Sequence, residues 1–213
     1  MSSEATPAAA VEVFGPQLPL ARRFAEKLAT EGVLRGLIGP REPQRLWSRH
    51  LLNCAAVAEL FPDGVRVVDV GTGAGLPGIA IALCRPDLRV DLVEPLQRRI
   101  DFLIEAVGEL DIGERVRVVR GRAEDASVVE VAGSAAWVTA RAVAPLDRLV
   151  RWCFPLLAPG GQLAAMKGAG AADELAQHRI SLSRLGGTNA RIVKCGRGVV
   201  DPPVTVVLVD RAR

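Results

Sequence analysis

A glycine-rich turn directly after an apolar strand is the feature that most constrains this chain. The β-branched stretch Val65–Val70 is followed by Gly71-Thr72-Gly73-Ala74-Gly75 and then by a predicted helix that runs to Ala82. Glycine permits backbone angles and close approaches that a Cβ would block. Backbone N–H groups of such a turn line a nucleotide-like ligand at the carboxyl edge of a parallel sheet. The turn therefore predicts an α/β protein with a nucleotide-type site.

The spacing of the glycines separates two classes of ligand. A dinucleotide fingerprint, G-x-G-x-x-G, would place its third glycine at position 76. This chain has Leu76 there, its third glycine is Gly75, and the acidic Asp69 lies two residues before Gly71. These features resemble motif I of the class I S-adenosylmethionine-dependent methyltransferases. They favour that cofactor over NAD, so a nicotinamide-dependent dehydrogenase is the weakest alternative.

Composition limits the class of protein. A chain of 213 residues, 49% of them hydrophobic, is typical of one domain with its own core. Its four cysteines form no C-x-x-C pair, which predicts buried, reduced thiols and no metal site. The N-terminus has no secretory pattern, and no apolar run has the length of a membrane span. We therefore expect a cytoplasmic protein, and the net charge of +3 weakly favours a polyanionic partner.

Two kinds of pattern divide the chain. Apolar residues follow a helical period from residue 18 to 61, with a break at Gly39-Pro40, and Met1–Ala10 is expected to be disordered. Strands and helices alternate afterwards, which predicts a Rossmann-like, doubly wound and mostly parallel sheet with an antiparallel edge strand. We predict an N-terminal helical extension at 1–63 packed on a methyltransferase domain at 64–213. The predicted strands are Val65–Val70, Arg89–Glu94, Arg115–Val119, Ala135–Ala140, Gln162–Lys167, Arg191–Lys194 and Val204–Val209. The predicted later helices are Leu96–Leu110, Pro145–Leu157 and Asp173–Arg184.

Polar residues stand at the carboxyl ends of these strands, where ligands of such sheets bind. Glu94 ends the second strand, and a carboxylate there accepts hydrogen bonds from the ribose hydroxyls of an adenosine-containing cofactor. Arg122-Ala123-Glu124 follows the third strand, where methyltransferases of this class hold the adenine. Arg141 ends the fourth strand and suits a carboxylate, a phosphate or a base edge. Lys167 ends the fifth strand with the same geometry.

Basic pairs on two predicted helices are candidate phosphate contacts. Arg49-His50 lies in the N-terminal helical region, and the alternative for His50 is a half-buried structural side chain. Arg98-Arg99 follows the second strand, and the alternative for this pair is an ordinary solvated helix face. Both interpretations stay open for each pair.

Two other methylation chemistries lack their residues here. Amino-group methylases use an Asn/Asp-Pro-Pro-aromatic tetrad, and Asp201-Pro202-Pro203-Val204 lacks the aromatic and is predicted to be a turn before the last strand. A cytosine C5 methylase needs a nucleophilic cysteine near the target base, and Thr139–Leu146 contains none. Cys153 lies in an apolar helix and is expected in the core. We assign no catalytic residue.

Several motifs occur together in one order. They are Trp47–Cys54, Asp69–Ile79 (DVGTGAGLPGI), Leu92–Pro95, Arg98–Leu103, Arg122–Glu124, Arg141–Leu146 (RAVAPL) and Met166–Gly168. With them the chain strongly resembles the small-subunit ribosomal RNA guanine-N7 methyltransferase G family, also called glucose-inhibited division protein B, from about Leu34 to the closing strand.

The resemblance implies methyl transfer from S-adenosyl-L-methionine to N7 of a guanine in the decoding-region 530 loop of 16S rRNA, with S-adenosyl-L-homocysteine as product. Guanine N7 carries a free lone pair, so the reaction needs no general base. The implied partner is 16S rRNA or the small ribosomal subunit. Two alternatives remain: a non-catalytic RNA-associated assembly factor that binds the cofactor, and a methyltransferase for another substrate. The implied cofactor contacts are Gly71, Gly73, Gly75, Leu76, Glu94, Ala123, Glu124 and Arg141. The implied RNA contacts are Arg49, His50, Arg99, Arg122 and Lys167.

Overall fold

The structure, a computed structural model, describes residues 3–141 and 144–213. Ala142 and Val143 of the RAVAPL motif lie outside the described residues, as do Met1 and Ser2 at the N-terminus. No helix within the described ranges is long and apolar enough to span a bilayer.

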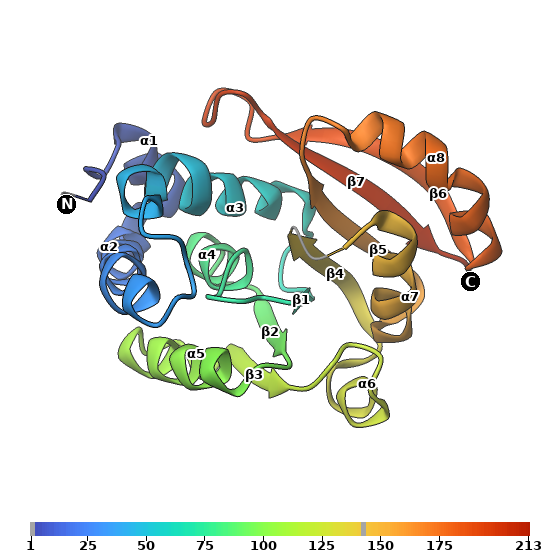
Figure 1. Ribbon diagram of the computed structural model, residues 1–213, viewed down its shortest axis with the longest axis horizontal. Helices are drawn as coiled ribbons and strands as arrows, with labels where there is room; N and C mark the ends of the chain where they lie inside the picture. The colour runs from blue at the N-terminus through green and yellow to red at the C-terminus, as the bar shows by residue number, and fades with distance from the viewer. Residues whose placement is uncertain (1–2, 142–143) are drawn as a thin grey trace.

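A seven-stranded sheet runs through the molecule in the order β3-β2-β1-β4-β5-β7-β6 (Figure 1). The strands β1 to β5 are parallel, and β7 runs antiparallel to both β5 and the edge strand β6. This confirms the predicted α/β class and the mostly parallel, doubly wound sheet, with its antiparallel pairing at the edge. The strands are β1 (Arg66–Val70), β2 (Arg89–Glu94), β3 (Val116–Arg120), β4 (Ala135–Arg141), β5 (Leu157–Lys167), β6 (Gly187–Cys195) and β7 (Val204–Arg211).

Helices cover both faces of the sheet because the apolar strands send alternate side chains to each face. In β1, Val67 belongs to the hydrophobic cluster on one face, and Val68 and Val70 belong to the cluster on the other. The first cluster includes side chains of α4 (Gly78–Cys84) and α5 (Gln97–Glu109). The second includes side chains of α6 (Ala126–Ala132), α7 (Leu146–Cys153) and α8 (Ala171–Arg184). The glycine turn after β1 thus lies between two packed layers.

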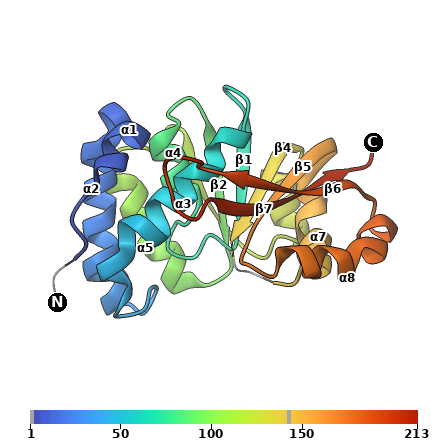
Figure 2. The same cartoon turned by 90° about the horizontal axis from the view of Figure 1, so that it is seen from above.

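The N-terminal helices add to the first layer. Figure 2 shows α1 and α2 at one end of the molecule and α8 at the other. Phe24 of α2 and Trp47 are buried in the same hydrophobic cluster as Ile79 of α4. Residues on both sides of the predicted boundary at 63/64 share this core, and the division of the chain into an extension and a domain stays a prediction. The elements are α1 (Ala8–Phe14), α2 (Leu18–Lys27), α3 (Leu52–Ala56) and the short helices η1 (Gly15–Gln17), η2 (Leu28–Gly32), η3 (Glu42–Arg45), η4 (Leu46–Leu51) and η5 (Val57–Leu60).

The expected disorder of Met1–Ala10 is wrong for the described residues of that segment. Helix α1 begins at Ala8, and Ala10 is fully buried. The carboxylate of Glu4 accepts hydrogen bonds from the backbone N–H groups of Trp47, at 2.7 Å, and Ser48. A carboxylate is favourable at a helix N-terminus, because the first N–H groups there have no partner within the helix. This contact ties the N-terminal segment to the protein.

Several other elements differ from their predicted bounds, and the segment from α6 to β5 shows the main differences. The predicted helix Pro145–Leu157 ends as α7 at Cys153, followed by the short helix η6 (Phe154–Leu156). Strand β5 already begins at Leu157. The segment Ala158-Pro159-Gly160-Gly161, whose proline and glycines are typical of the end of a helix, therefore lies within a strand. Helix α6 was not predicted, because its seven residues are too few to show a helical period. Cys153 lies in the core, as expected.

Candidate functional site

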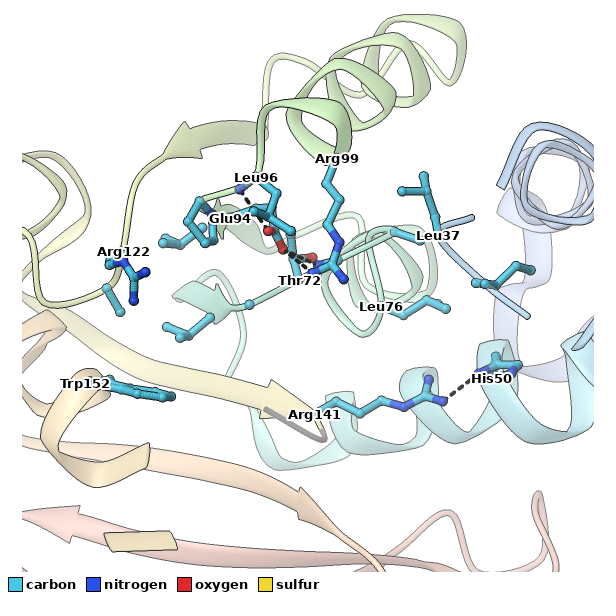
Figure 3. Close-up of a pocket in the computed structure, with 18 of the residues that line it drawn as sticks. Leu37, His50, Thr72, Leu76, Glu94, Leu96, Arg99, Arg122, Arg141 and Trp152 are labelled. Atoms are coloured by element: carbon cyan, nitrogen blue, oxygen red, sulfur yellow. Dashed lines mark hydrogen bonds and ion pairs between the residues drawn. The ribbon is translucent and has the colours of Figure 1, made fainter. Parts of the chain in front are cut away.

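A cleft of about 780 Å³ opens at the carboxyl ends of β1, β2, β3 and β4, and Figure 3 shows side chains that line it. The size is typical of a pocket for one small ligand or cofactor. The glycine turn forms its floor, and residues of η3 and η4 complete one wall. The cleft is therefore built from the parallel sheet and from the N-terminal helical region together.

The glycine turn requires residues without a side chain at two positions. Gly75 has φ +88°, in the region that favours glycine, and a Cβ there would lie 2.5 Å from Ile79 Cδ1. A Cβ on Gly78 would lie 2.3 Å from Leu92 Cδ2, so α4 is able to approach β2 this closely only because residue 78 has no side chain. The Gly71 N–H donates to the Val93 carbonyl at 2.9 Å and fixes the turn to β2.

Asp69 is fully buried beneath the turn. One carboxylate oxygen, Oδ2, accepts from the Gly78 N–H at 2.7 Å. Burial raises the pKa of Asp69 to about 7, although the Gly78 N–H acts in the opposite direction. The other oxygen, Oδ1, and the hydroxyl of Thr72 have no hydrogen-bond partner among the described residues. Two polar atoms beneath the turn are thus left for a ligand or water.

Glu94 presents its carboxylate at the end of β2, and the residue is 1% exposed. Its Oε2 accepts from the Gly73 N–H at 3.1 Å and from Arg99 Nη1 at 3.2 Å. Its Oε1 accepts from the Leu96 N–H at 3.1 Å. Because these donors hold both oxygens, the carboxylate has one defined orientation in the cleft. Residual acceptor capacity suits hydroxyl donors such as those of a ribose.

Arg141 crosses toward the N-terminal wall from the end of β4 (Figure 3). Its Nη2 lies 2.5 Å from Nδ1 of His50, and its Nη1 lies 2.9 Å from Sγ of Cys54. On the far side of the imidazole, Nε2 of His50 lies 2.5 Å from Oε2 of Glu42. In the part of the chain that the structure describes, Arg141 forms no ion pair with a carboxylate. The cleft therefore contains a cation without a carboxylate partner.

The other predicted cofactor residues lie along the same cleft. Gly71, Gly73, Leu76, Ala123 and Glu124 all line it. Gly75 shapes the turn without lining the cleft. The structure thus brings together residues that are up to 70 positions apart in the sequence.

The predicted RNA residues fall into two groups. Arg49, Arg99 and Arg122 line the cleft, and the Arg49 side chain is 57% exposed. His50 is only 8% exposed and uses both ring nitrogens within the protein, so a direct RNA contact finds no support. Lys167 does not line the cleft: its Nζ donates to Glu174 and to the Ala144 carbonyl, both at 2.8 Å. Sequence patterns do not show such internal partners, because each pair joins side chains of different elements that only the folded structure brings together.

Sequence reasoning missed several residues of the site. Glu42 and Leu37 belong to the region around the Gly39-Pro40 break, which looks like a plain linker in the sequence. Trp152 of α7 lines the cleft opposite Arg122 (Figure 3), although its position in an amphipathic helix gives no signal of a ligand role. Glu42 had no signal apart from its charge, and only tertiary structure brings it to His50.

The described residues contain no cluster of histidine, cysteine or acidic side chains that could hold a metal ion. The four cysteines are unpaired, and three of them are buried. Burial raises the pKa values of the Cys153 and Cys195 thiols. These thiols are structural by their environment.

Comparisons with known proteins agree with this arrangement. The family model of the rRNA small subunit methyltransferase G matches residues 17–202. The chain is 58% identical over 210 residues to the ribosomal RNA small subunit methyltransferase G of Salinispora arenicola, with 96% of this chain and 86% of that protein covered. It is 56% identical over 202 residues to the protein of the same name of Mycolicibacterium gilvum, with 95% and 88% covered.

A solved structure supports the fold. The crystal structure of a SAM-dependent methyltransferase from Aquifex aeolicus aligns with a TM-score of 0.56 at 16% identity, with 90% of this chain and 97% of that chain covered. At this identity the likeness concerns the fold alone. The family model and the relatives at more than half identity show the family: the chain belongs to the rRNA small subunit methyltransferase G family.

Proposed function

We propose that this protein transfers the methyl group of S-adenosyl-L-methionine to N7 of a guanine in the 530 loop of 16S rRNA. The observation that carries the proposal is a cleft with a buried carboxylate, Glu94, and a cation without a carboxylate partner, Arg141, in a chain of this family. An rRNA substrate supports a cytoplasmic location for the protein. Unassembled 16S rRNA and the small subunit are both candidate partners.

The residues of the cleft fit the proposed cofactor. Glu94 suits the ribose hydroxyls, because its carboxylate is buried, oriented and able to accept more hydrogen bonds. Arg141 suits the carboxylate of the methionine part, which would supply the missing anion. The Thr72 hydroxyl, which lines the cleft and has no partner among the described residues, adds a further polar group beneath the turn. Backbone groups of Ala123 and Glu124 are available to the adenine edge, and Gly73 and Leu76, which also line the cleft, are available to the ribose and the sulfonium.

The chemistry needs positioning more than proton transfer. When bound, S-adenosyl-L-methionine supplies an electrophilic methyl group on a sulfonium and leaves as S-adenosyl-L-homocysteine. The N7 lone pair forms the new C–N bond, and no proton has to leave before the attack. The protein therefore has to hold N7 in line with the methyl carbon and exclude water. Such positioning is able to supply about 7–11 kcal/mol of the barrier reduction.

Basic side chains at the cleft support an RNA substrate. Arg49, Arg99 and Arg122 lie at the cleft, and the side chain of Arg49 is 57% exposed, whereas that of Arg99 is 33% exposed. Arginine planes stack on unpaired bases and bind phosphates, which suits a single-stranded loop. Lys167 is a weaker candidate, because Glu174 already neutralises its charge.

An assay with defined RNA tests the proposal. Purified protein is incubated with labelled S-adenosyl-L-methionine and with 16S rRNA transcribed in vitro or small subunits that lack the modification, and the product nucleoside is mapped by mass spectrometry. We expect 7-methylguanosine at one guanine of the 530 loop. Fully modified subunits serve as the control and should accept no label. Label only on protein or small molecules would favour a methyltransferase for another substrate. Cofactor binding without product in a single turnover would favour an assembly factor.

The RNA contact at Arg49 has its own test. Because Arg49 is exposed at the cleft and carries a full charge, Arg49→Ala should weaken RNA binding and lower the slope of log K against log salt by about one. The measurement is a filter-binding titration at several salt concentrations. An unchanged slope would remove Arg49 from the RNA interface.

A further inference from the structure

We propose that His50 is a positioning residue for cofactor binding: Glu42 holds it in one neutral tautomer, and in that form it fixes the guanidinium of Arg141 in the cleft. The proposal rests on the proposed function only in taking S-adenosyl-L-methionine as the ligand. It assigns to His50 a role inside the protein in place of the RNA contact expected from the sequence.

The hydrogen-bond inventory determines the tautomer. A guanidinium has only donors, so the 2.5 Å contact between Arg141 Nη2 and His50 Nδ1 requires an unprotonated Nδ1. A neutral imidazole then carries its proton on Nε2. That nitrogen lies 2.5 Å from Glu42 Oε2, to which it donates. The direction of every bond in the chain Arg141, His50, Glu42 is therefore fixed.

The charges around the imidazole keep it neutral. Burial is the largest effect and lowers the pKa of His50, the charge of Arg141 acts in the same direction, and Glu42 acts against both. Arg45 holds the pKa of Glu42 down to about 2, so this carboxylate stays ionised. The groups that face His50 are Glu42 of η3, Arg49 of its own helix η4 and Arg141 of β4. A second proton on His50 would place an imidazolium against the guanidinium.

The consequence for the cofactor lies in Arg141. Its long side chain has many rotamers, and Cys54 and His50 are the two groups that orient its guanidinium in the described structure. These two bonds use two of its five N–H donors, and three remain for a ligand carboxylate. A side chain that is already ordered loses less freedom on binding, so it binds more tightly. The N-terminal helical region thereby contributes to the cofactor site through the orientation of Arg141.

Two substitutions of His50 distinguish the roles of its two ring nitrogens. In His50→Asn, the amide group overlies Nδ1 and offers an acceptor to Arg141, but it does not reach Glu42. In His50→Gln, the amide group overlies Nε2 and reaches Glu42, but the acceptor next to Arg141 is lost. We expect calorimetry with S-adenosyl-L-homocysteine to give a dissociation constant roughly tenfold higher or more for His50→Gln, and one within about threefold of the original protein for His50→Asn.

A matched control separates positioning from loss of stability. Lys27→Met removes another buried cation from the N-terminal helices, where Lys27 Nζ pairs with Glu109 at 2.7 Å, far from the cleft. This variant should melt at a lower temperature and bind the homocysteine product with unchanged affinity. If both His50 variants weakened binding equally, or neither weakened it, the positioning role of His50 would be wrong.

A spectroscopic measurement tests the tautomer directly. The chain has two histidines, His50 and His178, so a ¹⁵N spectrum of the imidazoles is assigned by comparison with His178→Gln. We expect His50 at pH 7 to carry its proton on Nε2 alone, whereas a protonated Nδ1 would overturn the proposal. Because these tests use cofactor binding and not methyl transfer, they stay informative if 16S rRNA proves not to be the substrate. A protein that binds no cofactor at all would overturn the proposed function itself.

Discussion

Two buried carboxylates stand at the carboxyl ends of neighbouring strands, and their surroundings give them different properties. Glu94 accepts hydrogen bonds from Gly73, Leu96 and Arg99, which hold its carboxylate in one orientation at the cleft. Asp69 has one backbone donor and lies deeper, so burial dominates and raises its pKa to about 7. Glu94 thus presents oriented oxygen atoms to the cleft, whereas Asp69 supports the turn from beneath.

The role of Glu94 predicts a loss of cofactor affinity in Glu94→Gln. The amide keeps the size of the side chain, but it removes the charge and places an NH2 donor where one carboxylate oxygen now accepts from N–H groups. A hydrogen bond to a charged group is worth about 1.5–3 kcal/mol, which corresponds to a roughly 10- to 100-fold higher dissociation constant for S-adenosyl-L-homocysteine. Calorimetry measures it, and circular dichroism checks that the fold is intact. Affinity equal to that of the original protein would remove Glu94 from the site.

The raised pKa of Asp69 predicts a pH dependence of stability. Its folded-state pKa of about 7 lies above the ordinary value of 3.8, so the unfolded chain loses this proton first as the pH rises. The contribution of the Asp69 carboxyl group to the free energy of unfolding is therefore fully present below about pH 4 and is lost as the pH rises through 7. Asp69→Asn cannot lose a proton, so its stability relative to the original protein should improve between pH 4.5 and 7.5. Urea unfolding at the two pH values measures this difference, and a difference that stays constant would contradict the prediction.

At the scale of elements, the sequence pattern predicted the strands well, because buried parallel strands are short apolar runs bounded by turns. The prediction placed Arg89–Glu94 with the bounds that the structure shows, and it placed β1 within one residue. Helix α6 and the start of β5 were missed, because seven residues show no period and Pro159-Gly160 looks like a helix end. The site followed the same rule: residues attached to the glycine turn and strand ends were predicted, whereas Glu42 and Trp152 needed tertiary contacts.

Substitution by alanine should have opposite effects at two glycines, Gly78 at the junction of the turn and α4 and Gly108 on α5. In Gly78→Ala, the new Cβ would meet Leu92 and Asp69 at 2.3 and 2.7 Å, so the free energy of unfolding should fall by about 1–3 kcal/mol. In Gly108→Ala, the Cβ enters open space on the exposed face of α5, and a helix gains about 0.5–1 kcal/mol from the exchange. Urea unfolding of both variants measures the pair. A stable Gly78→Ala would show that α4 is able to move away from β2.

At the scale of the whole molecule, the N-terminal helices are joined to the sheet layer by apolar and charged contacts. The buried Lys27 pairs with Glu109 of α5, and Arg35 pairs with Glu105 of the same helix at 2.5 Å. Phe102 of α5 lies beneath both cations. Because the Lys27 side chain is buried, removal of its carboxylate partner would leave an uncompensated charge between the helices and cost stability. The N-terminal helices therefore belong to the same cooperative unit as α4 and α5.

This arrangement predicts that residues 64–213 do not fold alone. Such a fragment exposes the faces of α4 and α5 that now pack against Phe24, Leu28 and Trp47, and it also lacks the cleft wall of Glu42 and His50. We expect a fragment that binds a hydrophobic dye, has no cooperative urea transition and binds no S-adenosyl-L-homocysteine. The full chain, purified in parallel, is the control. If the fragment unfolded cooperatively and bound the ligand, residues 1–63 would be an extension that the domain predicted at 64–213 does not need. A cooperative fragment without binding would instead show that these residues are needed for the site alone.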